Sequence, residues 1–196
     1  MIRAVIIDRH PAMRAGIEAL FSRTDDVVIV AGVSDDPREV AHALYRTAPD
    51  VVIVEHSTPG VDGVELARLI KAWPPAPRVV IHADGIDATL VATAMLAGAD
   101  ALADSRGEAR DLAAAVRSAA RGRALFPELD SATRSDLARR LAGQDQPILR
   151  MFLAAVAPRD VARALKVDAR TLRARMNAII DSLRETGGGT PSAAAG

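Results

Sequence analysis

The sequence predicts an α/β domain with a five-stranded parallel sheet covered on both faces, followed by a small all-α domain. Strand and helix patterns alternate five times within the first 123 residues. The strand segments are continuous apolar runs, which is typical of parallel strands buried on both faces. Beyond residue 141 only helical periodicity remains.

Short apolar runs rich in β-branched residues predict the strands, and amphipathic segments between them predict the helices. Pro11 suits the first turn of the first helix, and Gly98 and Gly122 suit the ends of the last two. The expected strands are Arg3–Asp8, Val27–Val33, Asp50–Glu55, Arg78–Ile81 and Ala101–Ala103, and the expected helices are Pro11–Ser22, Asp36–Arg46, Val61–Lys71, Asp87–Leu96 and Ala109–Arg121.

Residues 124–140 are expected to form a linker with a short helix, Ser135–Leu141, which Asp130 or Ser131 would cap. Residues 141–185 predict a helical domain in which a tight turn, Lys166-Val167-Asp168, separates two helices. Asp168 is placed to cap the second of these. The helices expected there are Ile148–Val156, Pro158–Leu165 and Ala169–Arg184, and the low-complexity tail 186–196 is expected to be disordered.

Composition excludes several classes of function. The chain has no cysteine, which removes disulfides and thiolate metal sites, and its four scattered histidines argue against structural zinc. We expect no metal and no cofactor. No apolar run reaches the roughly 20 residues that a membrane span needs, and the N-terminus lacks the pattern of a signal peptide. The sequence therefore predicts a cytoplasmic protein with no membrane partner.

Enzymatic activity is not expected either. Asp8 and Glu55 end neighbouring strands, with His10 and His82 at the same edge, which superficially suits acid–base catalysis. A single histidine beside a strand end is more often structural. The segment Arg9-His10-Pro11 after the first strand also differs from a glycine-rich phosphate loop.

Charge is distributed unevenly along the neutral chain. From Ser131 onward there are 11 basic and six acidic residues, whereas the first 130 residues hold 14 basic and 19 acidic ones. A difference in net charge of this size between two parts of a chain can arise by chance. The functional interpretation is that the C-terminal part binds a polyanion.

Four motifs in the first half resemble the receiver domain of a response regulator, in particular the NarL/FixJ class. The resemblance covers residues 1 to about 123 and implies a CheY-like fold. The matching motifs are Ile6-Ile7-Asp8-Arg9-His10-Pro11, Pro49-Asp50-Val51-Val52-Ile53-Val54-Glu55, Thr58-Pro59-Gly60-Val61-Asp62-Gly63 and Ala97-Gly98-Ala99-Asp100.

The same resemblance implies that the phosphorylation pocket is degenerate. Of the acidic pair that binds Mg²⁺ in receivers only Asp8 remains, because its neighbour is Arg9, and Glu55 occupies the place of the phosphoacceptor aspartate. Ala83 stands at the serine or threonine position and Ser105 at the lysine position, while Leu102 stands at the aromatic switch position. A guanidinium cannot supply the oxygen ligand that Mg²⁺ requires, and Glu55 is one methylene longer than aspartate.

Arg9 and Glu55 admit two interpretations. They are either ordinary solvated charges at strand ends or a fixed ion pair in place of the metal and the phosphoaspartate. A sharper version makes Glu55 a mimic of phosphoaspartate. The missing hydroxyl and aromatic groups argue against that version.

Residues 141–184 resemble the LuxR-type helix-turn-helix module in diverged form. The matching residues include Asp160, Val161, Leu165, Thr171 and Leu172, and Lys166 stands where the family has glycine. Arginine and asparagine suit bidentate contacts with base edges in the major groove. The residues expected to contact bases are Arg170, Arg173, Arg175 and Asn177, and those expected to hold phosphates are Arg159, Arg163 and Thr171.

Two functions follow from these resemblances. The first is a DNA-binding transcription regulator that acts on promoter DNA with a receiver independent of phosphorylation. A homodimer would form through the receiver, and a small-molecule ligand is an open alternative to phosphate. Leu90, Leu96 and Val116 are the candidate dimer residues, since the fourth helix that commonly dimerises LuxR-type modules has no counterpart before the tail. The second function is a protein-interaction module that no longer reads DNA.

Overall fold

The computed structural model describes residues 1–57 and 61–187 of the chain. It divides into two compact units. The sheet unit comprises Met1–Ile86 and Gly98–Pro127, and the helical unit joins Asp87–Ala97 to the chain from Glu128 onward. None of the helices in the described ranges is both long and apolar enough to span a bilayer.

The sheet unit contains a five-stranded sheet of order β2-β1-β3-β4-β5 in which every neighbouring pair is parallel. This confirms the predicted fold class. β4 runs two residues beyond the predicted Ile81, because His82 and Ala83 pair with Ala103 and Asp104 of β5. The strands are β1 (Ile2–Ile7), β2 (Val27–Val33), β3 (Val51–Glu55), β4 (Arg78–Ala83) and β5 (Ala101–Asp104).

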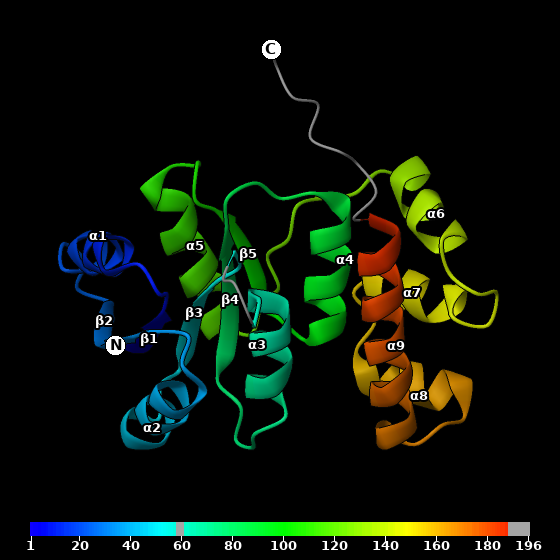
Figure 1. The fold of residues 1–196 in the computed structure, drawn as a ribbon, viewed down its shortest axis with the longest axis horizontal. Coiled ribbons are helices and arrows are strands. Elements are labelled where there is room, and N and C mark those ends of the chain that lie inside the picture. The colour runs from blue at the N-terminus through cyan, green and yellow to red at the C-terminus, as the bar shows by residue number, and fades with distance from the viewer. Residues whose placement is uncertain (58–60, 188–196) are drawn as a thin grey trace, which may run out of the picture. The chain divides into compact units, whose positions relative to one another are not determined.

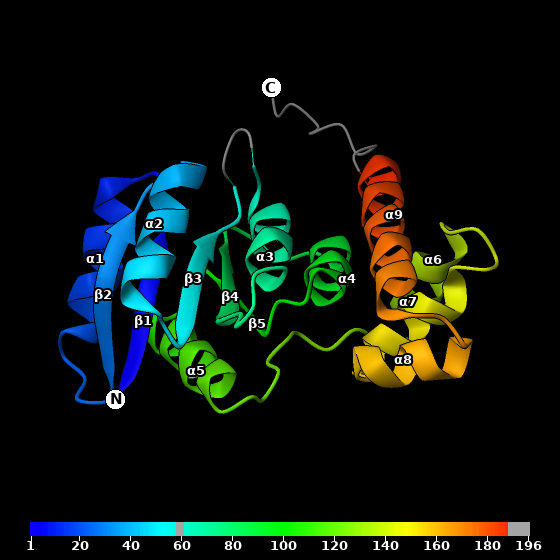
Figure 2. The same ribbon diagram turned by 90° about the horizontal axis from the view of Figure 1, so that it is seen from below.

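Two helices lie on each face of the sheet within this unit (Figures 1 and 2). Alternate strand residues such as Ile6, Ile53 and Val80 pack with α1 and α5 into one buried core. The residues between them, such as Val52, are equally buried on the opposite face, beneath α2 and α3. The helices are α1 (Pro11–Phe21), α2 (Pro37–Thr47), α3 (Gly63–Lys71) and α5 (Ala109–Ala120).

The end of β3 is held by the first turn of α3. Asp62 caps this helix, its Oδ1 accepting from the backbone N–H groups of Val64 and Glu65 at 2.9 Å. A Cβ atom on Gly63 would lie 2.8 Å from the carbonyl oxygen of Glu55. Only glycine therefore allows the loop to return this closely, which explains the Asp62-Gly63 part of the receiver motif.

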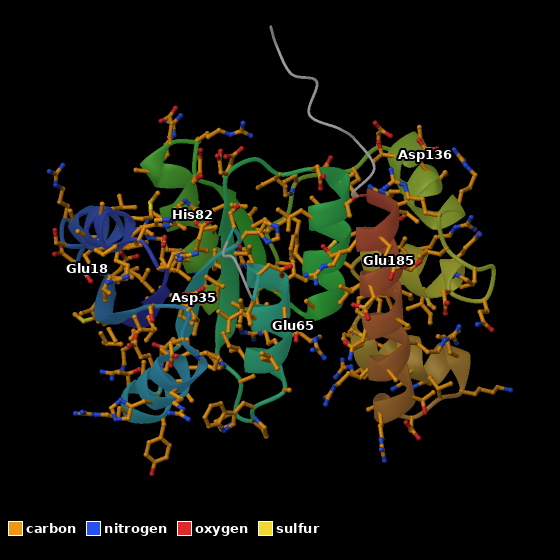
Figure 3. All side chains as sticks on the ribbon, in the orientation of Figure 1. Glu18, Asp35, Glu65, His82, Asp136 and Glu185 are labelled. Carbon is orange, nitrogen blue, oxygen red and sulfur yellow. The ribbon has the colours of Figure 1, made fainter. Side chains whose placement is uncertain are left out.

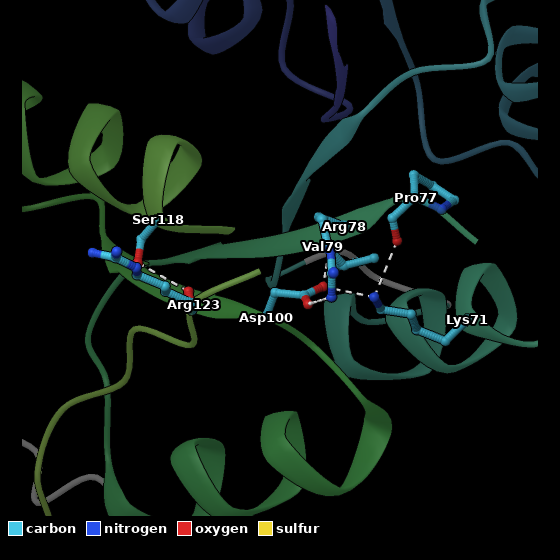
Figure 4. Close-up of polar contacts among 7 residues, drawn as sticks. All are labelled: Lys71, Pro77, Arg78, Val79, Asp100, Ser118 and Arg123. Atoms are coloured by element: carbon cyan, nitrogen blue, oxygen red, sulfur yellow. Dashed lines mark hydrogen bonds and ion pairs between the residues drawn. The ribbon is translucent and has the colours of Figure 1, made fainter. Parts of the chain in front are cut away.

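Asp100 connects three segments at the opposite edge, where the strands begin (Figure 4). Its Oδ2 accepts from Lys71 Nζ at 2.6 Å and from the Val79 N–H at 2.8 Å, and its Oδ1 accepts from Arg78 Nη1 at 2.9 Å. Gly98, with φ of +84°, ends the preceding helix in the left-handed conformation. Through Asp100, the Ala97-Gly98-Ala99-Asp100 motif thus connects the start of β5 to β4 and α3 by hydrogen bonds and ion pairs.

The helical unit has its own core. α4 carries no charged residue and packs against α7 and α9. Ile148, Leu149, Ile179 and Leu183 are at most 1% exposed. The helices are α4 (Ala88–Ala97), α6 (Ser131–Arg139), α7 (Gln146–Leu153), α8 (Pro158–Leu165) and α9 (Ala169–Gly187).

Several helix boundaries in this unit differ from the prediction, and α7 spans Gln146–Leu153 rather than Ile148–Val156. α6 starts at Ser131 rather than Ser135, because Asp130 caps it by accepting from the Thr133 N–H at 2.7 Å. α9 continues to Gly187, so the first two residues of the predicted tail are helical. The rest of that tail, 188–196, lies outside the described residues.

Candidate functional site

The carboxyl edge of the sheet brings together the predicted pocket residues. Asp8 directly follows β1, and Glu55 and Ala83 end β3 and β4. Ser105 follows β5, and its N–H donates to the Ala83 carbonyl oxygen at 2.8 Å. The pocket is therefore built from four parallel strand ends, as expected for this fold.

Asp8 is buried with incomplete hydrogen bonding. Its side chain is 2% exposed, and Oδ1 accepts from the backbone N–H of His10 at 2.7 Å. The Nδ1 atom of His10 lies 3.1 Å from the same oxygen. Within the described residues, Oδ2 has no hydrogen-bond partner. A buried carboxylate oxygen without a partner is costly, and such groups are common at functional sites.

Glu55 turns into the same pocket. Its Oε1 accepts from the Ser57 N–H at 2.9 Å, and its Oε2 lies 3.8 Å from Nδ1 of His82. Burial raises the pKa of Glu55, and the negative charge of Asp8 raises it further. Burial also lowers the pKa of His82, which lies on β4 within the sheet layer (Figure 3). Both groups are thus pushed toward their neutral forms.

Of the two interpretations of Arg9 and Glu55, the fixed ion pair is not formed. Arg9 is exposed, and it forms no salt bridge with any carboxylate in the described part of the chain. The carboxylate of Glu55 faces inward, where the Ser57 amide and His82 surround it. Arg9 is therefore a solvated charge, the other interpretation that the sequence allowed.

Two of the remaining pocket positions hold buried apolar side chains. Ala83 is fully buried and Leu102, at the switch position, is 5% exposed. Asp104 was not among the predicted residues; its Oδ1 accepts from the Arg106 N–H at 2.9 Å, and that hydrogen bond lowers its pKa. The signal available in the sequence is an acid at a strand end with an arginine two positions later.

These residues do not fit a Mg²⁺ ion. Among residues 1–57 and 61–187, no three histidine, aspartate or glutamate side chains lie close enough to share a metal. Mg²⁺ requires near-octahedral oxygen ligands. Asp8 offers one free oxygen, whereas Arg9 offers none and Glu55 is engaged with Ser57.

The second candidate site is the pair α8 and α9. Lys166 ends α8 in the left-handed conformation with φ of +53°. Asp168 then caps α9 by accepting from the Thr171 N–H at 2.7 Å. The two helices are thereby joined by a three-residue turn, as predicted, although lysine replaces the residue type that favours this backbone.

Most of the predicted DNA-contacting side chains lie on the surface. Arg159 and Arg163 have side chains 83% and 77% exposed, and both lie near Asp160. Arg170, Thr171 and Arg173 are exposed. Neither Arg170 nor Arg173 forms an ion pair within the described residues. Asn177 is only partly exposed.

Arg175 is held inside the helical unit. Its Nη2 donates to Oδ1 of Asp145 at 2.8 Å and to the carbonyl oxygen of Gln144 at 2.6 Å, and its Nε lies 3.2 Å from the same carboxylate. The side chain is 28% exposed. Arg175, which the sequence predicts to contact bases, instead connects α9 to the start of α7.

The proposed apolar dimer residues also lie inside the chain. Leu90 is 7% exposed, Leu96 is 1% exposed and Val116 is fully buried. These side chains are used in the cores of the protomer, so they are not available as an exposed apolar interface.

Known proteins resemble this chain in sequence and in fold. Residues 4–117 match the family model described as the response regulator receiver domain. The response regulator protein VraR of Staphylococcus aureus is 25% identical over 189 residues, which cover 93% of this chain and 90% of VraR.

Similar solved structures include a LuxR-family two-component response regulator from Aurantimonas sp. SI85-9A1, with 25% identity and a TM-score of 0.60 over 71% of this chain and 96% of that one. RcsB of Salmonella typhimurium is 19% identical, with a TM-score of 0.60 over 93% of this chain and 92% of RcsB. A structure of two RcsB dimers bound to two parallel DNAs has a TM-score of 0.60 at 20% identity, over 96% of this chain and 99% of that one.

Proposed function

The chain belongs to the response regulator receiver family, and on this premise we propose that it is a DNA-binding transcription regulator whose receiver works without aspartate phosphorylation. The domains would be the receiver, 1–123, a linker at 124–140 and a diverged LuxR-type helix-turn-helix module at 141–185. The observation that carries DNA binding is that Arg170 and Arg173, directly after the tight turn, are exposed and form no ion pair with any described residue.

The side chains that line the phosphorylation pocket support independence from phosphorylation. Glu55 replaces the acceptor and is engaged by the Ser57 amide, and Ala83 offers no hydroxyl group. Ser105 offers no ammonium group, and in the described part of the chain no three histidine, aspartate or glutamate side chains are grouped to hold a metal ion. The pocket therefore lacks the aspartate acceptor, the hydroxyl group and the ammonium group of a complete receiver, and Asp8 alone remains of its acidic pair.

Intact-mass measurement tests this proposal. The full chain is incubated with acetyl phosphate and Mg²⁺, beside a response regulator with a complete pocket as a positive control. We expect no added phosphoryl group on the wild type or on Glu55→Asp, because restoring the acceptor does not restore the metal site, the hydroxyl or the ammonium. A phosphoryl adduct on the wild type would overturn the proposal.

The helical unit supports DNA recognition in the following way. Arg173 is exposed on α9, at the flank of the buried stripe that contains Leu172, Ile180 and Leu183. Arginine makes bidentate contacts with guanine in the major groove, each worth about 1–3 kcal/mol. Arg159 and Arg163 on α8 would contact phosphates. RcsB, whose fold is similar, has been seen as dimers bound to DNA.

Selection of genomic fragments by the purified full chain tests DNA binding. We expect enrichment of a sequence motif, and we expect Arg173→Ala to weaken binding to the recovered fragment by about 5- to 150-fold. Arg139→Ala is the matched control, because it removes an exposed arginine from α6. Normal binding by Arg173→Ala would show that the recognition helix is assigned wrongly.

Absence of any enriched fragment would instead favour the protein-interaction module. Arg175→Ala is unsuitable for this test, because the loss of its contact with Asp145 disturbs the unit itself. Two-fold DNA sites are usually read by dimers, so we also propose a homodimer through the receiver, using surface other than Leu90, Leu96 and Val116. Analytical ultracentrifugation of the full chain at micromolar concentration tests this.

A further inference from the structure

A pocket of about 610 Å³ opens at the amino edge of the sheet. It lies within the sheet unit, at the opposite end of the strands from Asp8 and Glu55. The C-terminal ends of α2 and α3 and the segments that begin β3 and β4 surround it. Its volume is within the 300–1,000 Å³ that is typical of small-molecule sites.

The only tryptophan and the only tyrosine of the chain both line this pocket. Trp73 is 48% exposed and Tyr45 is 82% exposed. Aromatic residues make up only 3% of the sequence, and Phe21, by contrast, is buried in the core. Two large rings placed at one surface hollow form the kind of exposed apolar patch that marks a binding site.

Prolines form much of the remaining wall. Pro49 and Pro77 line the pocket together with the pair Pro74 and Pro75. Proline has a fixed φ and no N–H donor. The wall is therefore apolar, and its backbone has few conformations to lose when a ligand binds.

The lining holds one cation, Arg78, and one carboxylate, Asp50. Arg78 uses Nη1 to contact Oδ1 of Asp100 at 2.9 Å, while Lys71 contacts Oδ2 of the same carboxylate at 2.6 Å. Two cations thus share one anion. Asp50, the carboxylate in the lining, accepts from the backbone N–H of Arg3 at 2.8 Å. The Arg78 side chain remains 47% exposed, so it can contact a further anion.

We propose that this pocket binds a planar aromatic molecule that carries one carboxylate. Its ring packs against Trp73 and Tyr45, and its carboxylate pairs with Arg78. Charge complementarity selects the anion, and the two aromatic side chains select the flat ring. This binding site goes beyond the proposed function, because the pocket lies at the opposite edge of the sheet from Asp8 and Glu55 and belongs to a different unit from α9.

The test uses the full chain and 2-naphthoate as the probe. Because Trp73 is the only tryptophan, its indole N–H gives a single resonance that reports directly on the pocket. We expect saturable binding by calorimetry, with the indole resonance shifting along the same isotherm. The matched neutral probe 2-naphthylmethanol should bind about tenfold more weakly, since it lacks the anion.

Variants locate the site. Tyr45→Ala and Trp73→Ala should each weaken binding about 3- to 10-fold, and Arg78→Lys should reduce the preference for the anionic probe while keeping the positive charge beside Asp100. Met13→Ala, which removes an exposed apolar side chain from α1, is the control and should bind normally. Circular dichroism establishes that each variant is folded.

Three results would overturn the proposal. They are an unchanged indole resonance at saturating 2-naphthoate, equal affinity for the charged and neutral probes, and normal binding by a folded Tyr45→Ala variant. All the measurements are made without DNA, so their failure is distinguishable from failure of the proposed DNA binding.

Discussion

Both edges of the parallel sheet hold carboxylates, but these carboxylates differ in how fully their oxygens are hydrogen-bonded. At the amino edge, both oxygens of Asp100 have partners, which are Lys71, Arg78 and the Val79 amide. At the carboxyl edge, Asp8 is more deeply buried, yet one of its oxygens has no partner in the described chain. Burial therefore does not by itself ensure that a charge is satisfied.

This difference distinguishes the structural role of Asp100 from the role of the groups at the carboxyl edge, which lie where receivers have their functional site. A fully paired carboxylate that connects β4, β5 and α3 contributes to stability and organises the strands. The poorly paired groups at the other edge, Asp8, Glu55 and His82, cost stability, as groups at functional sites often do. Each of the following substitutions should change one side of this comparison.

The largest effect is expected for Asp100→Ala. It leaves Lys71 and Arg78 without their shared anion and removes the acceptor of the Val79 amide, so the free energy of unfolding should fall by about 3 kcal/mol. Urea denaturation measures this. Asp26→Ala is the control, because the Asp26–Arg117 pair is more exposed, so solvent screens it and its loss should change stability much less. Equal losses in the two variants would contradict a special role for Asp100.

His82 should make stability depend on pH. Since burial lowers its pKa in the folded state, the unfolded chain binds more protons as the pH falls below the ordinary value of 6.5. Stability should be lost there by up to about 1.4 kcal/mol per pH unit. His82→Asn should flatten that slope, whereas His42→Asn, on the exposed side of α2, should not. An unchanged slope in His82→Asn would show that another group titrates.

Gly98→Ala tests the backbone that positions Asp100. With φ of +84°, an alanine there should cost about 1–2 kcal/mol. Gly16 in α1 provides the opposite control, because a Cβ atom there meets nothing within 4 Å. Gly16→Ala should stabilise the protein by about 0.5–1 kcal/mol, as alanine favours helix. Thermal denaturation of both variants distinguishes strain from a general effect of alanine.

Glu55→Gln should give a smaller change of opposite sign to Asp100→Ala. The folded-state pKa of Glu55 is raised, so the stability associated with its protonated form is lost as the pH rises through that pKa. Glutamine removes this loss, and we expect a gain of about 1 kcal/mol near neutral pH that disappears in acid. Glu39→Gln at the exposed start of α2 is the matched control. A loss of stability would mean that Glu55 has a favourable partner.

The sequence predicted the sheet unit well for identifiable reasons. Its strands are short, continuous apolar runs, and prolines and glycines mark many of the connections. The start of α6 is less predictable from the sequence. Asp130 is a candidate cap in the prediction, but the predicted helix begins four residues after the observed one. A weakly apolar first turn, Ser131-Ala132-Thr133-Arg134, gave no periodic signal.

The candidate sites were harder to predict, since they depend on contacts between distant residues. Strand order brought Asp8 and Glu55 to one edge, which the βα pattern could indicate. Which way Glu55 and Arg9 turn depends on the Ser57 amide and on His82, and no spacing rule encodes that geometry. The contact of Arg175 with Asp145 spans 30 positions and was equally invisible in the sequence.

The contact between Arg175 and Asp145 has a consequence for ion release. An arginine that reaches a DNA phosphate displaces condensed counterions, and each neutralised phosphate steepens the logarithmic salt dependence of binding by about 0.9. Arg175 already has a carboxylate as its counterion, so engaging DNA would exchange one anion for another. The salt slope of this chain should therefore be about one phosphate shallower than a count of the basic side chains on α8 and α9 suggests.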